Sequence, residues 1–273
     1  MRITKSHKII VYSILVILSL YFLFPFAWAL ITALKTEGEA FSFPPTFLPD
    51  VPQFGNFIEA WKSQPFGTYF MNSVIVTVMT TIGQIISCSL VAYGFARYDF
   101  KYKNILFILL LSTMMIPWDV TMIPLYMEFN LFGWINTLKP LIVPAFFGSA
   151  YNIFLLRQFL MNIPKDLESA ARIDGANEFQ IFYKIFLPIM KGPLTLIAVL
   201  NILLVWNDYL GPLIYLNDQS KYTMALGLAS FKGVHELQII PIMAMTLVMI
   251  IPPVIVFAFA QKYIVEGVSG SIK

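Results

Sequence analysis

Two acidic residues lie closest to the apolar segments of this 273-residue chain and are its first candidates for chemistry. Asp208 belongs to the stretch Trp206-Asn207-Asp208-Tyr209, whose rings could stack on a sugar ring while its amide and carboxylate bond hydroxyl groups. An equally good interpretation is that Asn207 and Asp208 cap a broken helix, because short polar side chains bond nearby backbone readily. The other acid, Asp119, is better explained as part of a proline break near the outer surface.

The residue patterns of the common enzyme classes are missing from the sequence. There is no G-x-x-x-x-G-K-[ST] phosphate-binding loop, so we do not expect the chain itself to bind or hydrolyse ATP. Cys88 is the one cysteine and lies inside an apolar segment, while His7 and His235 are far apart and better explained as solvated loop residues. We therefore expect no catalytic residues, no metal site and no cofactor bound by this chain.

The composition is that of an integral membrane protein. Hydrophobic residues make up 58% of the chain and charged residues 12%, whereas a soluble domain has about 25% charged residues. The apolar segments predict an all-α, polytopic protein with one transmembrane domain (1–273) and six transmembrane helices. These helices are expected at about 9–34, 68–96, 104–127, 139–160, 189–213 and 238–262.

The first and third apolar segments need separate interpretation. The first is longer than a signal-peptide core of roughly 7–15 residues, so we favour an uncleaved span, although Ala27-Trp28-Ala29 resembles a cleavage site. The third is interrupted at Ile116-Pro117-Trp118-Asp119, and a break at membrane depth requires protein or water beside it.

The distribution of basic residues predicts the orientation. With the N-terminus inside, thirteen of the 18 lysines and arginines fall on the cytoplasmic side, and this excess of positive charge places both termini in the cytoplasm. The residues expected inside are Arg2, Lys5, Lys8, Arg97, Lys101, Lys103, Arg157, Lys165, Arg172, Lys184, Lys191, Lys262 and Lys273, and those expected outside are Lys35, Lys62, Lys139, Lys221 and Lys232.

A polar loop at residues 163–188 separates the fourth and fifth apolar segments on the predicted cytoplasmic side. Pro164 suits a first helical position, and Leu167, Ala170 and Ala171 are spaced to share one helix face. Gly175 suits a left-handed stop, and Asn177 with Gln180 forms a capping-box pattern that starts another helix. The loop therefore predicts two short helices whose small-residue face another protein could contact, and an interfacial helix without a partner is less favoured.

The same loop carries a resemblance to a known family. It resembles the coupling loop of ABC-transporter permeases, with the pattern E-A-A-x-x-x-G followed by I-x-L-P, in the form typical of maltose-type carbohydrate permeases. The matching residues are Ala170, Ala171, Asp174, Gly175, Ala176, Ile185, Leu187 and Pro188. The glutamate position of the motif holds Ser169, and the nearest acid, Glu168, is one residue earlier. The resemblance extends from Leu34 to Gly267.

The resemblance implies a type I ABC importer permease fold, of the kind found in the smaller six-span permease of a pair. It implies a multi-pass protein of the prokaryotic cytoplasmic membrane, surrounded by the lipid bilayer, that imports a sugar or oligosaccharide and binds no nucleic acid. The implied partners are a second permease, two ATP-binding subunits that hold ATP and Mg, and an extracytoplasmic solute-binding protein. Coupling contacts would come from the 163–188 loop, including Glu168 and Ser169.

Two alternatives to a sugar importer remain open. An ABC permease for a non-sugar solute would look similar, because selectivity can reside in the binding protein or in the second permease. A secondary transporter is less favoured, since such proteins usually show internal repeats and more intramembrane ionisable residues.

Overall fold

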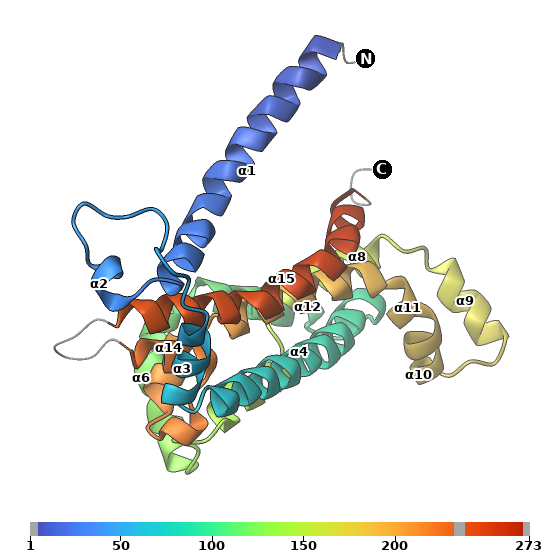
Figure 1. Ribbon diagram of the computed structural model, residues 1–273. Helices are drawn as coiled ribbons and strands as arrows, with labels where there is room; N and C mark the ends of the chain where they lie inside the picture. The colour runs from blue at the N-terminus through green and yellow to red at the C-terminus, as the bar shows by residue number, and fades with distance from the viewer. Residues whose placement is uncertain (1–4, 232–237, 270–273) are drawn as a thin grey trace. The chain divides into compact units, whose positions relative to one another are not determined.

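The computed structural model describes residues 5–231 and 238–269, which contain helices and connecting loops with no strand among them. His235 lies outside the described residues. The helices are α1 (Lys5–Ala33), α2 (Glu37–Ala40), α3 (Gly55–Ser63), α4 (Phe66–Arg97), α5 (Lys103–Ser112), α6 (Trp118–Leu131), α7 (Lys139–Ile142), α8 (Ala150–Met161), α9 (Asp166–Ile173), α10 (Glu178–Ile181), α11 (Leu187–Ile189), α12 (Lys191–Trp206), α13 (Leu210–Tyr215), α14 (Met224–Ala229) and α15 (Ile239–Ser269). Figure 1 shows their course.

Several of these helices could cross a membrane. Among the described residues, four are long and apolar enough: His7–Ala33, Phe66–Arg97, Lys139–Met161 and Ile239–Lys262. Two further candidates are bent pairs, Lys103–Met115 with Trp118–Leu131 and Glu178–Ile189 with Lys191–Trp206. Counting each bent pair as one span gives six, which agrees with the number predicted from the apolar segments.

The contacts divide the chain into two compact units. The first comprises Met1–Phe66 with Gly227–Ile251. In it the side chain of Lys35 is buried, donates to the carbonyl oxygen of Thr46 and lies 5.2 Å from the ring centre of Trp28. The amide of Asn56 donates to the carbonyl oxygens of Ala33 and Lys35, each at 2.9 Å. These bonds hold the polar segment after α1 in a folded loop.

The second unit, Gly67–Leu226 with Pro252–Lys273, contains most of α4 and the helices that pack against it. The amide of Asn201 in α12 donates to the hydroxyl oxygens of Thr80 and Thr81 in α4, at 3.3 and 2.9 Å. Gly83 in α4 faces the ring of Phe146, which a Cβ atom there would approach to 2.8 Å. Small and hydroxyl-bearing residues therefore allow close helix contact in this unit.

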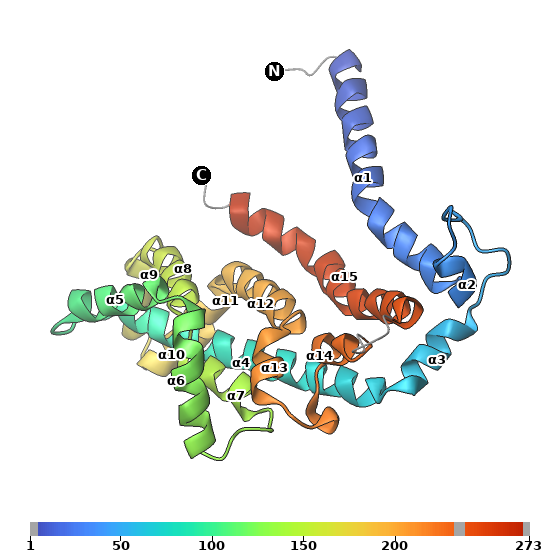
Figure 2. The same ribbon diagram turned by 90° about the vertical axis from the view of Figure 1, so that its left-hand side faces the viewer.

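The expected third span, 104–127, is not one straight helix. The segments Lys103–Met115 and Trp118–Leu131 meet at 99°, and Figure 2 shows α5 and α6 turning away from each other at this point. Pro117 lies between them and has no N–H with which to continue the helix. The break predicted at Ile116–Asp119 is confirmed.

Candidate functional site

The 163–188 loop forms two short helices joined by a tight turn. Asp166 and Glu168 lie in the first turn of α9, where the helix dipole favours negative charge. The helix is followed by Gly175 with φ +83°, which confirms the predicted left-handed stop. Pro164, however, is not the first helical residue, because α9 begins at Asp166 after Lys165 in the N-cap position.

The second helix starts with the predicted capping box. Asn177 Oδ1 accepts a hydrogen bond from the Gln180 N–H at 2.9 Å, and Gln180 Oε1 accepts one from the Asn177 N–H at 3.0 Å. Two backbone donors at the start of α10 are thereby satisfied within the loop. Figure 1 shows α9 and α10 extending beyond the C-terminal end of α4.

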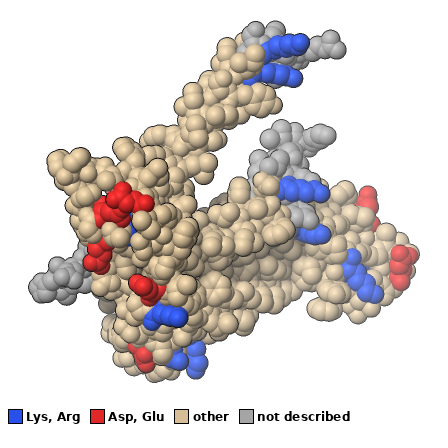
Figure 3. All heavy atoms as spheres, in the orientation of Figure 1, with Lys and Arg blue, Asp and Glu red and all other residues tan. Residues whose placement is uncertain are grey.

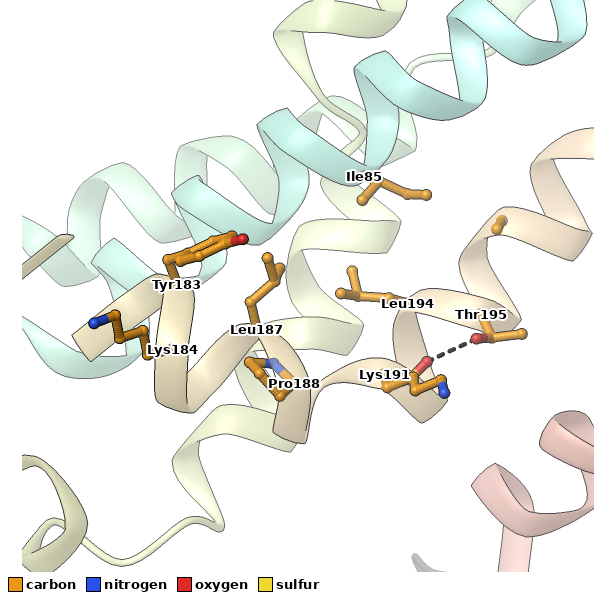
Figure 4. A pocket seen from close by; sticks show the side chains of 9 residues that line it. Ile85, Tyr183, Lys184, Leu187, Pro188, Lys191, Leu194 and Thr195 are labelled. Carbon is orange, nitrogen blue, oxygen red and sulfur yellow. Dashed lines mark hydrogen bonds between the residues drawn. The ribbon is translucent and has the colours of Figure 1, made fainter. Parts of the chain in front are cut away.

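A widened helical turn, Phe182–Phe186, follows α10 and was not predicted. It lies directly before Leu187 and Pro188, and Pro188 has no N–H to donate to the carbonyl four residues earlier. The chain then bends by 72° into α12. An open pocket of about 580 Å³ lies at this bend, and Figure 4 shows Leu187 and Pro188 among the side chains that line it. The other lining residues are Ile85, Tyr183, Lys184, Lys191, Leu194, Thr195 and Ala198.

One face of α9 packs against the rest of its own unit. Glu168 and Ala171 are buried there, and Ala171 belongs to an apolar core with Tyr93, Ile181 and Phe186. The expectation that Ala170 and Ala171 are presented together on one open face therefore fails for Ala171. Three- and four-residue spacing allowed either face to point outward, and the sequence did not reveal which side α4 would cover.

The opposite side of the loop is open and apolar. Leu167, Ala170 and Ile173 follow one another along α9, and Ile173 is 87% exposed. Phe179 in α10 is 71% exposed. We call these four residues the exposed face of the loop. Ser169, Asp174 and Gly175 are also exposed, and in Figure 3 the charged side chains of the loop stand apart from the uncharged surface of α4.

Four side chains connect the loop to the segment after α4. The Tyr98 hydroxyl donates to Glu178 Oε2 at 2.6 Å, and Arg172 Nε donates to Glu178 Oε1 at 3.0 Å. Arg172 Nη2 also lies 2.7 Å from Glu168 Oε1. Hydrogen bonds from Tyr98 and then Arg172 hold the pKa of Glu178 below its ordinary value. Tyr98 and Arg172 were absent from the predicted site, and a sequence separation of 80 residues leaves no local signal for the Tyr98–Glu178 contact.

The second predicted site, Trp206–Tyr209, has the geometry of a helix break. Trp206 is buried, with its ring edge-on to Phe70 at 5.7 Å. The Asn207 amide donates to the carbonyl oxygen of Leu203 at 2.8 Å, and Asp208 Oδ1 accepts from the Gly211 N–H at 3.1 Å. Tyr209 is 39% exposed. Local bonds thus occupy both polar side chains, which favours the capping interpretation over a sugar contact.

A cavity of about 550 Å³ next to Asp208 is lined mainly by apolar and aromatic side chains. Trp118, Phe129 and Tyr215 are among its lining residues. A sugar would need several hydrogen-bonding partners in such a space, and Asp208 is the one charged residue among those that line it. Asp119 is exposed in the first turn of α6, after Pro117, and does not line this cavity.

Long apolar helices, two bent helix pairs and a polar loop between spans are the features of a multi-pass membrane protein. Residues 85–270 match the family described as "Binding-protein-dependent transport system inner membrane component". Because this match covers more than half of the chain, the protein belongs to that family and is a permease subunit of an ABC transporter.

Curated relatives extend the similarity to almost the whole chain. The chain is 33% identical to "Probable ABC transporter permease protein YurM" of Bacillus subtilis strain 168, over 96% of this chain and 88% of that protein. It is 34% identical to "Melibiose/raffinose/stachyose import permease protein MelC" of the same organism, over 99% and 98% of the two chains. A "Lactose transport system permease protein LacG" of Rhizobium radiobacter is 31% identical, over 97% and 96%.

A solved structure agrees with the fold. It is the crystal structure of a bacterial ABC transporter involved in the import of the acidic polysaccharide alginate, and a chain in it superposes with a TM-score of 0.84. The superposition covers 97% of this chain and 99% of that one at 24% identity. The predicted type I importer permease fold is therefore confirmed.

Proposed function

We propose that this protein is one permease half of an ATP-driven importer that carries a sugar or oligosaccharide across the cytoplasmic membrane of a prokaryote. The names of the relatives support this substrate class, since melibiose, raffinose, stachyose and lactose are all carbohydrates. The exposed face of the 163–188 loop supports the need for a separate ATPase. A phosphate-binding loop is missing from the sequence, so ATP and Mg are expected on another chain.

The proposed role implies several partner subunits. A second permease completes the translocation path, two ATP-binding subunits bind the 163–188 loops, and an extracytoplasmic solute-binding protein delivers the carbohydrate. The excess of lysine and arginine supports a cytoplasmic position for both chain termini and for the 163–188 loop, within reach of the ATP-binding subunits. ATP-driven closure of those subunits would move the loops and reorient the spans.

The exposed face carries the docking proposal. Ile173 is 87% exposed and Phe179 is 71% exposed. Large apolar side chains that project from a polar loop outside the spans are typical of a surface that a partner covers. Ser169 has replaced the acid that the family motif places there, so apolar contact with the partner is the main attraction on this side of the loop.

Purification with the ATP-binding subunit tests this proposal. Ile173→Ser and Phe179→Ser should leave the amount of permease in the membrane unchanged, because neither side chain is packed inside the chain. The recovered ATP-binding subunit should fall several-fold. Met161→Ser is the matched control, since Met161 is also exposed, at 51%, but lies at the end of α8 outside the loop. Normal recovery of the ATP-binding subunit with both loop variants would contradict the docking proposal.

The chemical class of the imported solute is tested separately, by measuring the uptake of labelled solutes into membrane vesicles. Uptake of a di- or trisaccharide that depends on ATP and on the binding protein would support the proposed substrate class. ATP-dependent uptake of an amino acid or of an ion in its place would contradict the proposed carbohydrate substrate and leave the proposed ABC importer intact.

A further inference from the structure

The bonds made by Glu168, Arg172, Glu178 and Tyr98 form one continuous chain of side chains, which we call the clamp. One carboxylate oxygen of Glu178 accepts a hydrogen bond from the Tyr98 hydroxyl, and the other accepts one from Arg172. The Nη2 atom of Arg172 lies 3.0 Å from Glu178 and 2.7 Å from Glu168, so one guanidinium joins α9 to α10. The clamp therefore ties both helices of the loop to Tyr98, the residue that follows α4.

The acid nearest to the motif position points into the protein. Glu168 is only 6% exposed although α9 is a surface helix, and its carboxylate is paired with Arg172 on the next turn. Ser169, at the motif position itself, is exposed and donates a bond to the carbonyl oxygen of Lys165 at 3.4 Å. Two of the loop carboxylates, Glu168 and Glu178, are thus bound within the protein.

Both ends of the loop are also fastened to α4. Arg97, the last residue of α4, donates to the carbonyl oxygen of Ile163 at 2.9 Å, and its guanidinium lies 4.5 Å from the ring centre of Phe186. Tyr93, one turn earlier in α4, packs against the ring of Phe186 at 5.1 Å and edge-on to Tyr98 at 5.7 Å. The loop thus meets the C-terminal end of α4 in three places. The first is Ile163 at the start of the loop, the second is the clamp, and the third is Phe186 near the end of the loop.

A set of isolated surface ion pairs would contribute little, since exposed pairs are each worth about 0–1 kcal/mol. The clamp differs because its members share atoms and because its Glu168 end is buried. Arg172 holds its two carboxylates in a planar fork, which fixes direction as well as distance. Such a network holds the two helices and Tyr98 in one geometry better than a single flexible contact would.

We propose that Tyr98, Glu178, Arg172 and Glu168 are positioning residues that make the 163–188 loop and the C-terminal end of α4 move as one rigid body during transport. This inference rests on the proposed function of the loop. A push on the exposed face then rotates α4 directly, and α12 follows through the bonds of Asn201 to α4. Within the clamp, Glu168 is buried and so lies away from the exposed face.

Tyr98→Phe is the sharpest variant, because it removes one hydroxyl and keeps the ring that packs on Tyr93. Binding-protein-stimulated ATP hydrolysis and recovery of the ATP-binding subunit should stay at the wild-type level. Solute imported per ATP hydrolysed should fall several-fold, because the bond lost is one to a charged carboxylate. Glu178→Ala should give the same separation of transport from hydrolysis. Tyr102→Phe is the control, since it deletes a hydroxyl from an exposed tyrosine in the same segment between α4 and α5.

Distances between spin labels provide the readout that a merely structural role would not change. Labels at Ser169 and Lys101, introduced as cysteines in a Cys88→Ser protein, should keep one narrow distance with and without ATP in the assembled complex. In Tyr98→Phe the distribution should broaden when ATP binds.

Three results would overturn the clamp proposal. They are a distance that changes on ATP binding in the otherwise wild-type complex, normal import per ATP in both Tyr98→Phe and Glu178→Ala, or loss of the ATP-binding subunit in Tyr98→Phe. Failure of the proposed function would be seen earlier and differently, as a wild-type permease that recovers no ATP-binding subunit.

Discussion

The carboxylate of Asp208 accepts a hydrogen bond from the backbone N–H of Gly211, and a Cβ atom on Gly211 would lie 2.5 Å from Asp208 Oδ2. Side chain and backbone are therefore fitted to each other where α12 ends and α13 begins. The absence of a Cβ atom at Gly211 leaves room for the Asp208 carboxylate in its present position, and this carboxylate accepts a backbone bond at the start of the next helix.

Gly211→Ala should destabilise the protein. The new methyl group would overlap the Asp208 carboxylate and lie 3.3 Å from Leu141 Cδ2, and overpacking of this kind typically costs about 1–3 kcal/mol. The measurement is the thermal unfolding midpoint of the purified complex. Gly192→Ala is the matched control, because a Cβ atom there meets nothing within 4 Å and alanine stabilises helices by about 0.5–1 kcal/mol. Equal midpoints for the two variants would show that the tight contact at Gly211 relaxes freely.

Asp208→Asn should transport normally, whereas Asp208→Ala should lower the amount of assembled protein. Asparagine keeps an oxygen that can accept from the Gly211 N–H, while alanine loses the cap, at about 1 kcal/mol. Uptake normalised to the amount of protein in the membrane checks this. Loss of uptake in Asp208→Asn at a normal protein level would instead indicate that the carboxylate acts on the solute.

Adjacent alanines in α9 should respond differently to the same substitution. Ala171→Asp places a carboxylate in the apolar core of the unit, at a cost of about 3 kcal/mol or more, so the loop should become sensitive to protease. Ala170→Asp should leave the loop resistant to protease but weaken recovery of the ATP-binding subunit, because Ala170 belongs to the exposed face. Limited proteolysis and purification are run on both variants. Equal protease sensitivity would mean that Ala171 is not packed as described.

The orientation of the loop is tested by labelling single cysteines with a membrane-impermeant thiol reagent. In a Cys88→Ser protein, cysteine at Phe43 should be labelled from outside intact cells, and cysteine at Ser169 should be labelled only after the membrane is opened. Phe43 is a suitable external reporter, because it is 96% exposed. Labelling of Ser169→Cys in sealed cells would reverse the proposed topology.

The clamp should depend on pH in the acid range. The pKa of Glu178 is lowered by the bonds from Tyr98 and Arg172, so the stability it contributes is complete above its unfolded pKa of about 4.3 and is lost as the pH falls through the lower folded value. The unfolding midpoint of the wild-type complex should exceed that of Tyr98→Phe at pH 7, and the difference should shrink below about pH 4. A difference that stays constant down to pH 3.5 would show that the ionised carboxylate is not involved.

Local rules predicted the parts of the structure that depend on neighbouring residues. The Asn177–Gln180 capping box, the left-handed Gly175 and the break beside Pro117 were all expected from residue type and spacing. Each is fixed by bonds or steric limits within a few residues, so the sequence carries enough information to place it.

The parts that depend on distant residues were not predicted. The inward position of Glu168 and the burial of Ala171 are set by α4, whose last residues lie about 70 positions earlier in the chain. The Tyr98–Glu178 bond joins residues 80 positions apart. The widened turn at Phe182–Phe186 was not predicted either. The proline after it indicates that the helix is disturbed there, but not that the disturbance is a widened turn.

The contact of Asn201 with α4 also bears on the order in which the protein is made. The hydroxyl groups of Thr80 and Thr81 donate to the carbonyl oxygen of Thr77 in their own helix, so α4 can enter the bilayer with these donors already satisfied. The amide of Asn201 finds its acceptors 120 and 121 residues earlier in the chain. The hydroxyl donors of α4 are therefore satisfied without α12, whereas the Asn201 amide of α12 has these acceptors only after α4 has been made, so the contact between the two helices is completed when the later helix arrives.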